Sequence, residues 1–83
     1  MIKATTHYQK EFNQLPREVQ LRISDAIAEL GQNPHKFPLL KGKFKGLRKM
    51  RIGDYRVLYM VDDAKRMVVL VAVNERGQVY SSM

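Results

Sequence analysis

The sequence contains no cysteine, and its 8 acidic residues are outnumbered by 15 lysines and arginines. Without cysteine there is no disulfide framework and no thiolate metal site, and two isolated histidines do not build a zinc centre without carboxylate help. No stretch approaches the ~20 apolar residues that span a bilayer, and the start of the chain lacks the long apolar run of a targeting segment. We therefore expect a cytoplasmic protein with no metal, no small-molecule cofactor and no membrane partner.

The shortage of acidic residues is confined to one segment. Residues 36–56 contain a single acid, Asp54, and eight cations, which are Lys36, Lys41, Lys43, Lys45, Arg48, Lys49, Arg51 and Arg56. The other residues carry seven basic and seven acidic groups, so the whole net charge of +7 lies in this segment. Concentrated like charges repel one another, and a polyanionic partner relieves that repulsion. Nucleic acid is the leading candidate for that partner.

At 83 residues the chain is long enough for one domain, 1–83, with a modest core. Its 45% apolar content argues against a disordered basic tail. The pattern predicts an α+β fold in which an N-terminal helical hairpin packs on a twisted antiparallel sheet.

The N-terminal third predicts a short strand and two helices. Residues 2–5 alternate weakly, as in a strand. Thr6, with Gln9 three residues later, has the pattern of a capping box. The first helix would end at Pro16, which also suits the first turn of the second helix. Apolar residues at helical spacing then continue to Leu30, and Gly31 and Pro34 are stop signals.

The second half predicts a strand meander. A basic loop over residues 35–46 has four interleaved apolar residues that we expect to pin it to the body, namely Phe37, Leu39, Leu40 and Phe44. Strands are predicted over 47–52, 55–61 and 67–73, with turns at Gly53-Asp54 and at 62–65. The continuously apolar 67–73 is typical of a central strand, and 78–80 could add a short terminal one.

Alternation along the first of these strands places Lys49 and Arg51 on one face and Met50 with Arg48 on the other. Lys49 and Arg51 would lie about 7 Å apart, close to the spacing of successive phosphates. We interpret this face as an RNA-backbone site, the alternative being a solvated strand face. We count four further cations as RNA-binding residues: Lys41, Lys43, Lys45 and Arg48.

An arginine and two histidines can each be interpreted in two ways. Arg56 lies within an apolar strand and needs an anionic or carbonyl partner, which is either a phosphate or an acid such as Glu75. His7 and His35 are interpreted as surface residues rather than catalytic ones. No Ser/His/Asp set, paired carboxylates or glycine-rich phosphate loop is evident in the sequence.

The string from Gly46 to Tyr59, GLRKMRIGDYRVLY, followed by an apolar strand and the ending Asn74 to Tyr80, NERGQVY, resembles the RelE/ParE toxin family and within it the RelE branch. The resemblance covers nearly the whole chain, and the Arg-x-Gly-Asp-Tyr-Arg-x-x-Tyr centre is its most specific part. It implies a ribosome-dependent endoribonuclease that cuts mRNA and is neutralised by a cognate acidic, RelB-like antitoxin.

The resemblance also implies the catalytic residues. Arg56 and Arg76 match the phosphate-binding arginines of the family, Tyr80 matches its C-terminal tyrosine, and Lys49 with Arg51 matches its two alternating cations. Val79 stands where some RelE-like nucleases have a histidine, so the general base stays open. The implied reaction is attack of an RNA 2′-hydroxyl on the neighbouring phosphate without a metal.

Two other functions remain as alternatives. The first is a ParE-like toxin that inhibits gyrase by binding, without nuclease activity. The second is an inactive basic relative that binds RNA without cutting it.

Overall fold

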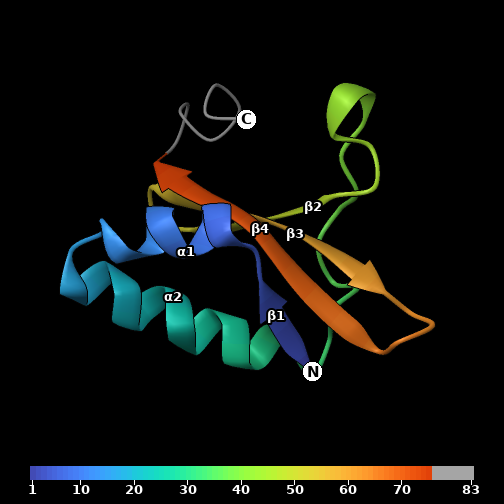
Figure 1. The fold of residues 1–83 in the computed structure, drawn as a ribbon, viewed down its shortest axis with the longest axis horizontal. Helices are drawn as coiled ribbons and strands as arrows, with labels where there is room; N and C mark the ends of the chain where they lie inside the picture. The colour runs from blue at the N-terminus through green and yellow to red at the C-terminus, as the bar shows by residue number, and fades with distance from the viewer. Residues whose placement is uncertain (76–83) are drawn as a thin grey trace.

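A computed structural model describes residues 1–75 of the chain. The elements follow in the order β1 (Ile2–Ala4), α1 (Thr6–Asn13), α2 (Arg17–Leu30), the 3₁₀ turn η1 (Gly42–Phe44), β2 (Arg48–Ile52), β3 (Tyr55–Asp62) and β4 (Met67–Glu75). The two helices lie together on one side of the sheet, and the long loop that carries η1 extends from the body at the other end (Figure 1). The predicted α+β fold, a helical hairpin on a sheet, is confirmed.

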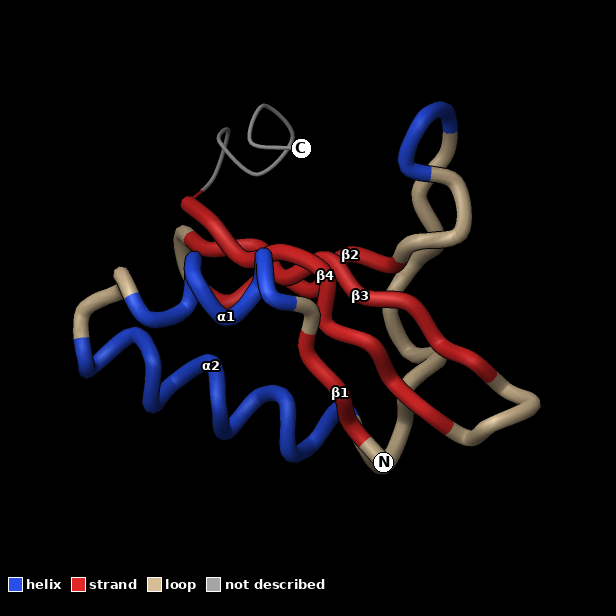
Figure 2. The backbone as a smooth tube through the Cα atoms, in the orientation of Figure 1, coloured by secondary structure: helices blue, strands red, loops and turns tan. Residues whose placement is uncertain are grey.

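The sheet has four strands in the order β1-β4-β3-β2. The three strands of the meander pair antiparallel, as predicted, but β1 pairs parallel with β4, with Ile2 opposite Val68 and Ala4 opposite Leu70. Parallel neighbours need a long connection, and here both helices and two further strands separate β1 from β4 in the chain (Figure 2). The sheet is therefore mixed rather than wholly antiparallel.

The first helix begins one residue earlier than a Thr6 cap would place it. Thr5 is the N-cap, with extended backbone angles (φ −70°, ψ 161°), and its Oγ1 accepts a hydrogen bond from the Tyr8 N–H at 3.1 Å. The Gln9 amide donates instead to the carbonyl of Ala4 at 3.1 Å. The predicted capping box was therefore wrong, because Thr5, which directly follows the strand, already fills the cap position.

The helical hairpin contributes Tyr8, Ile23 and Leu30 to the buried core. Tyr8 stacks on Phe12 in α1, with ring centroids 5.8 Å apart, and Ile23 and Leu30 of α2 are buried. The Gln20 amide donates to the Phe12 carbonyl at 2.8 Å and so ties the second helix to the end of the first. The sequence predicted that Pro16 lies in the first turn of α2. In the structure Pro16 is the N-cap, one residue before that turn.

Irregular pairing explains the unbroken apolar run of β4. Leu58 of β3 pairs with Ala72, but the next residue, Tyr59, pairs with Leu70, so Val71 is an extra residue in β4. This bulge reverses the alternation of faces, and Leu70 and Val73 both join the core beneath the helices. β4 lies between β1 and β3, which confirms the predicted central strand.

Candidate nucleic-acid interface

Three cations share the face of the sheet opposite the helices. On β2 and β3, Met50 and its partner Val57 belong to the core beneath the helices. Their neighbours must point the other way, because side chains alternate along a strand and directly paired residues share a face. This places Lys49, opposite Leu58, and Arg51, opposite Arg56, on the open side. We call Lys49, Arg51 and Arg56 the basic face.

Within the basic face, Arg51 and Arg56 are direct cross-strand partners. Such partners have their Cβ atoms about 4.5–5.5 Å apart, and like charges in that position are destabilising. Arg51 is exposed, whereas Arg56 is half-buried and its Nε atom is buried. Two arginines on the same face of neighbouring strands can bind one anion together, since each guanidinium offers a planar fork of donors to phosphate oxygens.

Arg48 lies apart from the basic face. It shares the helix side with Met50, as the alternation predicted, and its Nη1 donates to the carbonyls of Phe37 at 2.7 Å and His35 at 3.4 Å. Burial raises the pKa of the neighbouring Tyr59 phenol, and the Arg48 charge partly opposes that rise. Arg48 thus anchors the basic loop to the sheet, and its predicted contact with RNA stays a prediction.

The basic loop rests on the open side of the sheet through its apolar residues. Leu40, Phe44 and Leu47 pack against the buried Leu58 and Ala72. Phe37 joins the core beneath the helices instead, so the predicted pinning of the loop is confirmed for these residues. Leu39 does not take part, since 55% of it is exposed.

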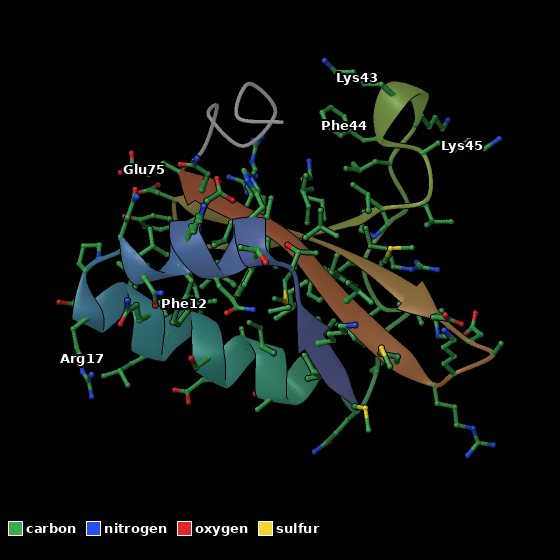
Figure 3. The ribbon with its side chains drawn as sticks, in the orientation of Figure 1. Phe12, Arg17, Lys43, Phe44, Lys45 and Glu75 are labelled. Atoms are coloured by element: carbon green, nitrogen blue, oxygen red, sulfur yellow. The ribbon has the colours of Figure 1, made fainter. Side chains whose placement is uncertain are left out.

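The lysines of this loop extend into solvent beside the basic face. Lys41, Lys43 and Lys45 are all exposed, and the Lys43 Nζ lies 5.3 Å from the centroid of the Phe44 ring. Lys43 and Lys45 point away from η1 on opposite sides of its tip (Figure 3). These lysines have long side chains and the same positive charge as the basic face. The structure therefore adds them as further hydrogen-bond donors at one edge of the sheet.

A second polar group, which no pattern in the sequence predicted, lies at the end of β4. β1 ends opposite Leu70, so the N–H groups beyond it would be unpaired, and α1 lies along this edge in its place (Figure 2). The Glu11 carboxylate of α1 accepts hydrogen bonds from the Val73 N–H at 2.9 Å and from the Asn74 side-chain amide at 3.1 Å. His7 Nε2 lies 3.2 Å from the same carboxylate. Asn74 is the direct partner of Arg56, so this group adjoins the basic face.

A cavity on the helix side of the sheet shares one lining residue, Arg51, with the basic face. It has a volume of about 640 Å³ and opens between α2 and β2, where Arg22, Glu29, Phe37 and Ile52 are among its lining residues. Acidic Asp25 and Glu29 line it together with cations. Since its charges are mixed, the basic face is the better site for a polyanion.

Comparison with known proteins agrees with this geometry. The sequence model of the family described as "ParE toxin of type II toxin-antitoxin system, parDE" matches residues 2–80. The chain belongs to this toxin family.

The relatives of the toxin include proteins named RelE and RelG. It is 27% identical over 81 residues to both "Toxin RelE" and "Toxin RelG" of Mycobacterium tuberculosis, covering 95% of this chain and 84% and 93% of those proteins. Among solved structures, the M. tuberculosis toxin-antitoxin complex RelBE2 matches with a TM-score of 0.85 at 27% identity, over 92% of this chain and 90% of that one. The isolated Escherichia coli RelE toxin matches with a TM-score of 0.79 at 23% identity, over 99% and 92%. The protein is therefore a RelE-like toxin of the type II toxin-antitoxin class.

Two predicted catalytic residues of the toxin, Arg76 and Tyr80, lie outside the described residues, as does the predicted terminal strand at 78–80. That Arg76 lies on the same side of the sheet as Arg56 stays a prediction.

Within residues 1–75, no three His, Cys, Asp or Glu side chains gather as a metal site would require. No helix in that range is long and apolar enough to cross a membrane.

Proposed function

We propose that this toxin is a ribosome-dependent endoribonuclease that cuts mRNA on its basic face, without a metal. The single observation that carries the proposal is the cross-strand pair of Arg51 and Arg56, with Lys49 on the same face. Two arginines on one face of the sheet suit a phosphodiester, because both guanidinium groups can donate hydrogen bonds to its oxygens. The resemblance of the chain to RelE-branch nucleases supports the same function.

In the proposed reaction, the 2′-oxygen of one nucleotide attacks the adjacent phosphorus, and the bond to the 5′-oxygen of the next nucleotide breaks. The products are a 2′,3′-cyclic phosphate and a 5′-hydroxyl end. Negative charge grows on the phosphoryl oxygens in the transition state, so guanidinium donors fixed around it stabilise the transition state more than the substrate. Arg56 is the first such donor, and Arg76 is the second.

The remaining residues of the proposed site hold the RNA. Lys49 and Arg51 contact the flanking phosphates, and Lys41, Lys43 and Lys45 extend this contact along the message or onto the ribosome. Tyr80 stacks on or orients a base. Arginine keeps its proton in proteins, so the arginines bind and stabilise but do not deprotonate the 2′-hydroxyl.

The proposed partners are the ribosome with its mRNA in the cytoplasm and an acidic, RelB-like antitoxin. Several similar structures are complexes of a RelE toxin with its antitoxin, among them the archaeal RelE-RelB complex from Pyrococcus horikoshii, with a TM-score of 0.76 at 27% identity. An acidic segment laid over the basic loop and the basic face would neutralise the +7 segment and exclude RNA from it.

The proposal is tested by mixing the purified toxin with programmed ribosomes under single-turnover conditions and mapping the 5′ ends of the message. Arg56→Ala removes one transition-state donor, and we expect its cleavage rate to fall by about 10²- to 10³-fold. Arg17→Ala is the matched control, because Arg17 is exposed and points away from the sheet at the start of α2 (Figure 3). Unchanged cleavage by Arg56→Ala, with its fold intact by circular dichroism, would remove Arg56 from the proposed role.

The second candidate function is inhibition of gyrase by binding, as the ParE name of the family model suggests. A gyrase inhibitor does not need the Arg51 and Arg56 pair to meet a phosphate. In cells, expression of a nuclease stops translation first, and expression of a gyrase inhibitor stops DNA replication first. Arrest of replication before translation would favour the second candidate.

A further inference from the structure

One short stretch of the sheet edge is open beside the cavity between α2 and β2. β2 is the last strand of the sheet, so a strand pairs with only one of its sides. On its other side, the Leu40 N–H donates to the Leu47 carbonyl at 2.8 Å, and the Lys49 N–H donates to the Pro38 carbonyl at 3.3 Å. The basic loop thus covers the beginning of this edge. Among the described residues, none pairs with the edge further along, at Arg51.

The register shows which backbone groups of β2 face this open edge. In an antiparallel strand the N–H and C=O of one residue point to the same side, and that side alternates from residue to residue. Because the Lys49 N–H bonds away from β3, its C=O points away from β3 as well. The same holds for both backbone groups of Arg51, two residues further on. The open edge therefore presents an acceptor, a donor and an acceptor in that order: Lys49 C=O, Arg51 N–H and Arg51 C=O.

The cavity lies against this edge and suits a neutral group better than an anion. Arg51 and Ile52 line it, and its volume of about 640 Å³ is within the range of small-molecule sites. Phe37 adds an aromatic ring to the lining. The carboxylates of Asp25 and Glu29, on the α2 wall, would repel a phosphate inside the cavity. A flat, uncharged group with a polar edge meets none of that repulsion.

Arg51 joins the cavity to the basic face. Its side chain lies on the open side of the sheet beside Arg56, and the residue also lines the cavity, where its N–H and C=O point out from the strand edge. A nucleotide whose phosphate binds the Arg51 guanidinium can therefore place its base around the edge of β2, against the backbone of the same residue. The phosphate then stays among cations, and the uncharged base enters the cavity of mixed charge.

We propose that this cavity binds an adenine base of the RNA substrate and that the open edge of β2 recognises it. This inference rests on the proposed nuclease function, because it names one base of that substrate. The Watson–Crick edge of adenine presents the 6-amino donor, the N1 acceptor and the C2–H group in that order. The amino group donates to the Lys49 carbonyl, the Arg51 N–H donates to N1, and the C2–H faces the Arg51 carbonyl as a weak donor.

The other three bases oppose this edge in the same position. Guanine and uracil set a ring N–H against the Arg51 N–H, and cytosine sets its O2 carbonyl against the Arg51 carbonyl. A site whose hydrogen-bonding groups are left opposed or unpaired rejects such a ligand. A peptide strand is also less suitable, because the open stretch from Lys49 to Arg51 is only about 7 Å long, whereas strands commonly run for about 5–6 residues.

The test follows the backbone amide resonances of the ¹⁵N-labelled toxin by NMR during titration with AMP, GMP, CMP and UMP. We expect AMP to shift the resonances of Arg51, Phe37 and Ile52. AMP should bind about 10-fold more tightly than the other three nucleotides, since a pair of hydrogen bonds to a base edge discriminates by about this factor. The matched ligand is purine riboside 5′-monophosphate, which lacks only the 6-amino group of AMP. It should lose that advantage.

Two substitutions of one residue separate its backbone from its side chain. Arg51→Pro removes the N–H donor, and because this N–H points away from β3, proline breaks no hydrogen bond of the sheet. Arg51→Ala removes the same side chain but keeps the N–H, so it is the matched control. We expect Arg51→Ala to keep the preference for AMP over UMP and Arg51→Pro to lose it. Circular dichroism checks the fold of both variants, and the nucleotide series on wild type stands without them.

The outcomes separate this inference from the function on which it rests. If the four nucleotides bind equally, or leave the Arg51 amide unmoved, the edge is open to water or to a peptide and the adenine assignment is wrong. Cleavage of mRNA that depends on Arg56 would still support the nuclease function. If Arg51→Ala loses the preference as fully as Arg51→Pro, recognition by the backbone is wrong. If the message stays intact on ribosomes while AMP binds as expected, the nuclease function fails and the adenine site stands.

Discussion

At the scale of single residues, two buried tyrosines show how differently one side chain type can be accommodated. Tyr59 is fully buried, and its hydroxyl donates to the Pro34 carbonyl at 2.8 Å. Tyr8 is 5% exposed, and its hydroxyl has no hydrogen-bond partner among the described residues. A buried hydroxyl without a partner has lost its hydration with no compensation. The two residues therefore predict opposite responses to the same substitution.

We expect Tyr8→Phe to leave the free energy of unfolding at neutral pH unchanged or to raise it, because the substitution removes only an unpaired polar atom. Tyr59→Phe should cost about 1 kcal/mol, because it breaks a bond and leaves the Pro34 carbonyl unpaired. Urea unfolding of both variants measures the difference. A larger loss of stability in Tyr8→Phe than in Tyr59→Phe would contradict the prediction.

The same tyrosine predicts a pH dependence of stability. Burial raises the pKa of Tyr8 from 10.0 to about 12. A phenol is neutral when protonated, so between these values the folded chain keeps a proton that the unfolded chain has lost. The resulting contribution to stability is complete below pH 10 and is lost as the pH rises toward 12. At pH 11 wild type should thus have lost about 1 kcal/mol more than Tyr8→Phe, relative to neutral pH. Parallel pH profiles of the two proteins would show that Tyr8 does not titrate in this range.

Single residues also show where sequence reasoning succeeds and where it stops. The alternation that predicted Lys49 and Arg51 on one face was sufficient, because a strand has only two faces. The role of Glu11 could not be predicted, since its partners Val73 and Asn74 are more than 60 residues away. The capping error at Thr6 arose because Thr5 and Thr6 are equally good caps, and only the end of β1 distinguishes them.

At the scale of elements, helices and antiparallel hairpins were predictable because their signals are local. The spacing of apolar residues located α2, and the Gly53-Asp54 turn located the β2–β3 hairpin, which the structure closes with Ile52 opposite Tyr55. The bulge at Val71 and the parallel pairing of β1 were not predictable. Both depend on contacts between distant segments, and a wholly apolar run such as 67–73 contains no alternation that would indicate a register.

The β2–β3 turn predicts the outcome of a glycine substitution. Gly53 has φ +60°, a region that side chains with a Cβ adopt only at a cost, and a Cβ there would lie 3.3 Å from Arg22 Nη1. We expect Gly53→Ala to lower the free energy of unfolding by about 1–2 kcal/mol. Gly31→Ala is the matched control. Gly31 has helical angles (φ −59°, ψ −24°), and a Cβ there meets its nearest atoms at an ordinary 3.5 Å, so this variant should be neutral or slightly more stable. Denaturant unfolding tests both, and equal effects would refute the argument from φ.

At the scale of the whole molecule, the helices and the basic face occupy opposite sides of the sheet. The body outside residues 36–56 is neutral by sequence, and the structure places the exposed lysines of the basic loop beside the basic face. This arrangement was predictable in outline, since the +7 segment is contiguous in the chain. Which cations face RNA was less predictable, because Arg48 belongs to the same segment and yet contacts loop carbonyls on the helix side.

This division predicts that affinity for RNA follows the location of a charge rather than the net charge. Lys45→Glu and Arg17→Glu each change the net charge by two units at an exposed residue, the first in the basic loop and the second at the start of α2, where the two side chains point to opposite ends of the molecule (Figure 3). A single-stranded RNA that releases counterions at each phosphate contact loses affinity with salt, with a slope of about 0.7 per contact. We expect Lys45→Glu to weaken binding of an RNA oligonucleotide at low salt and to reduce the salt slope by about 0.7, whereas Arg17→Glu should leave the slope unchanged. Fluorescence anisotropy over a series of salt concentrations measures both. An equal loss in the two variants would mean that RNA senses only the total charge of the toxin, and the basic loop would then have no specific part in binding.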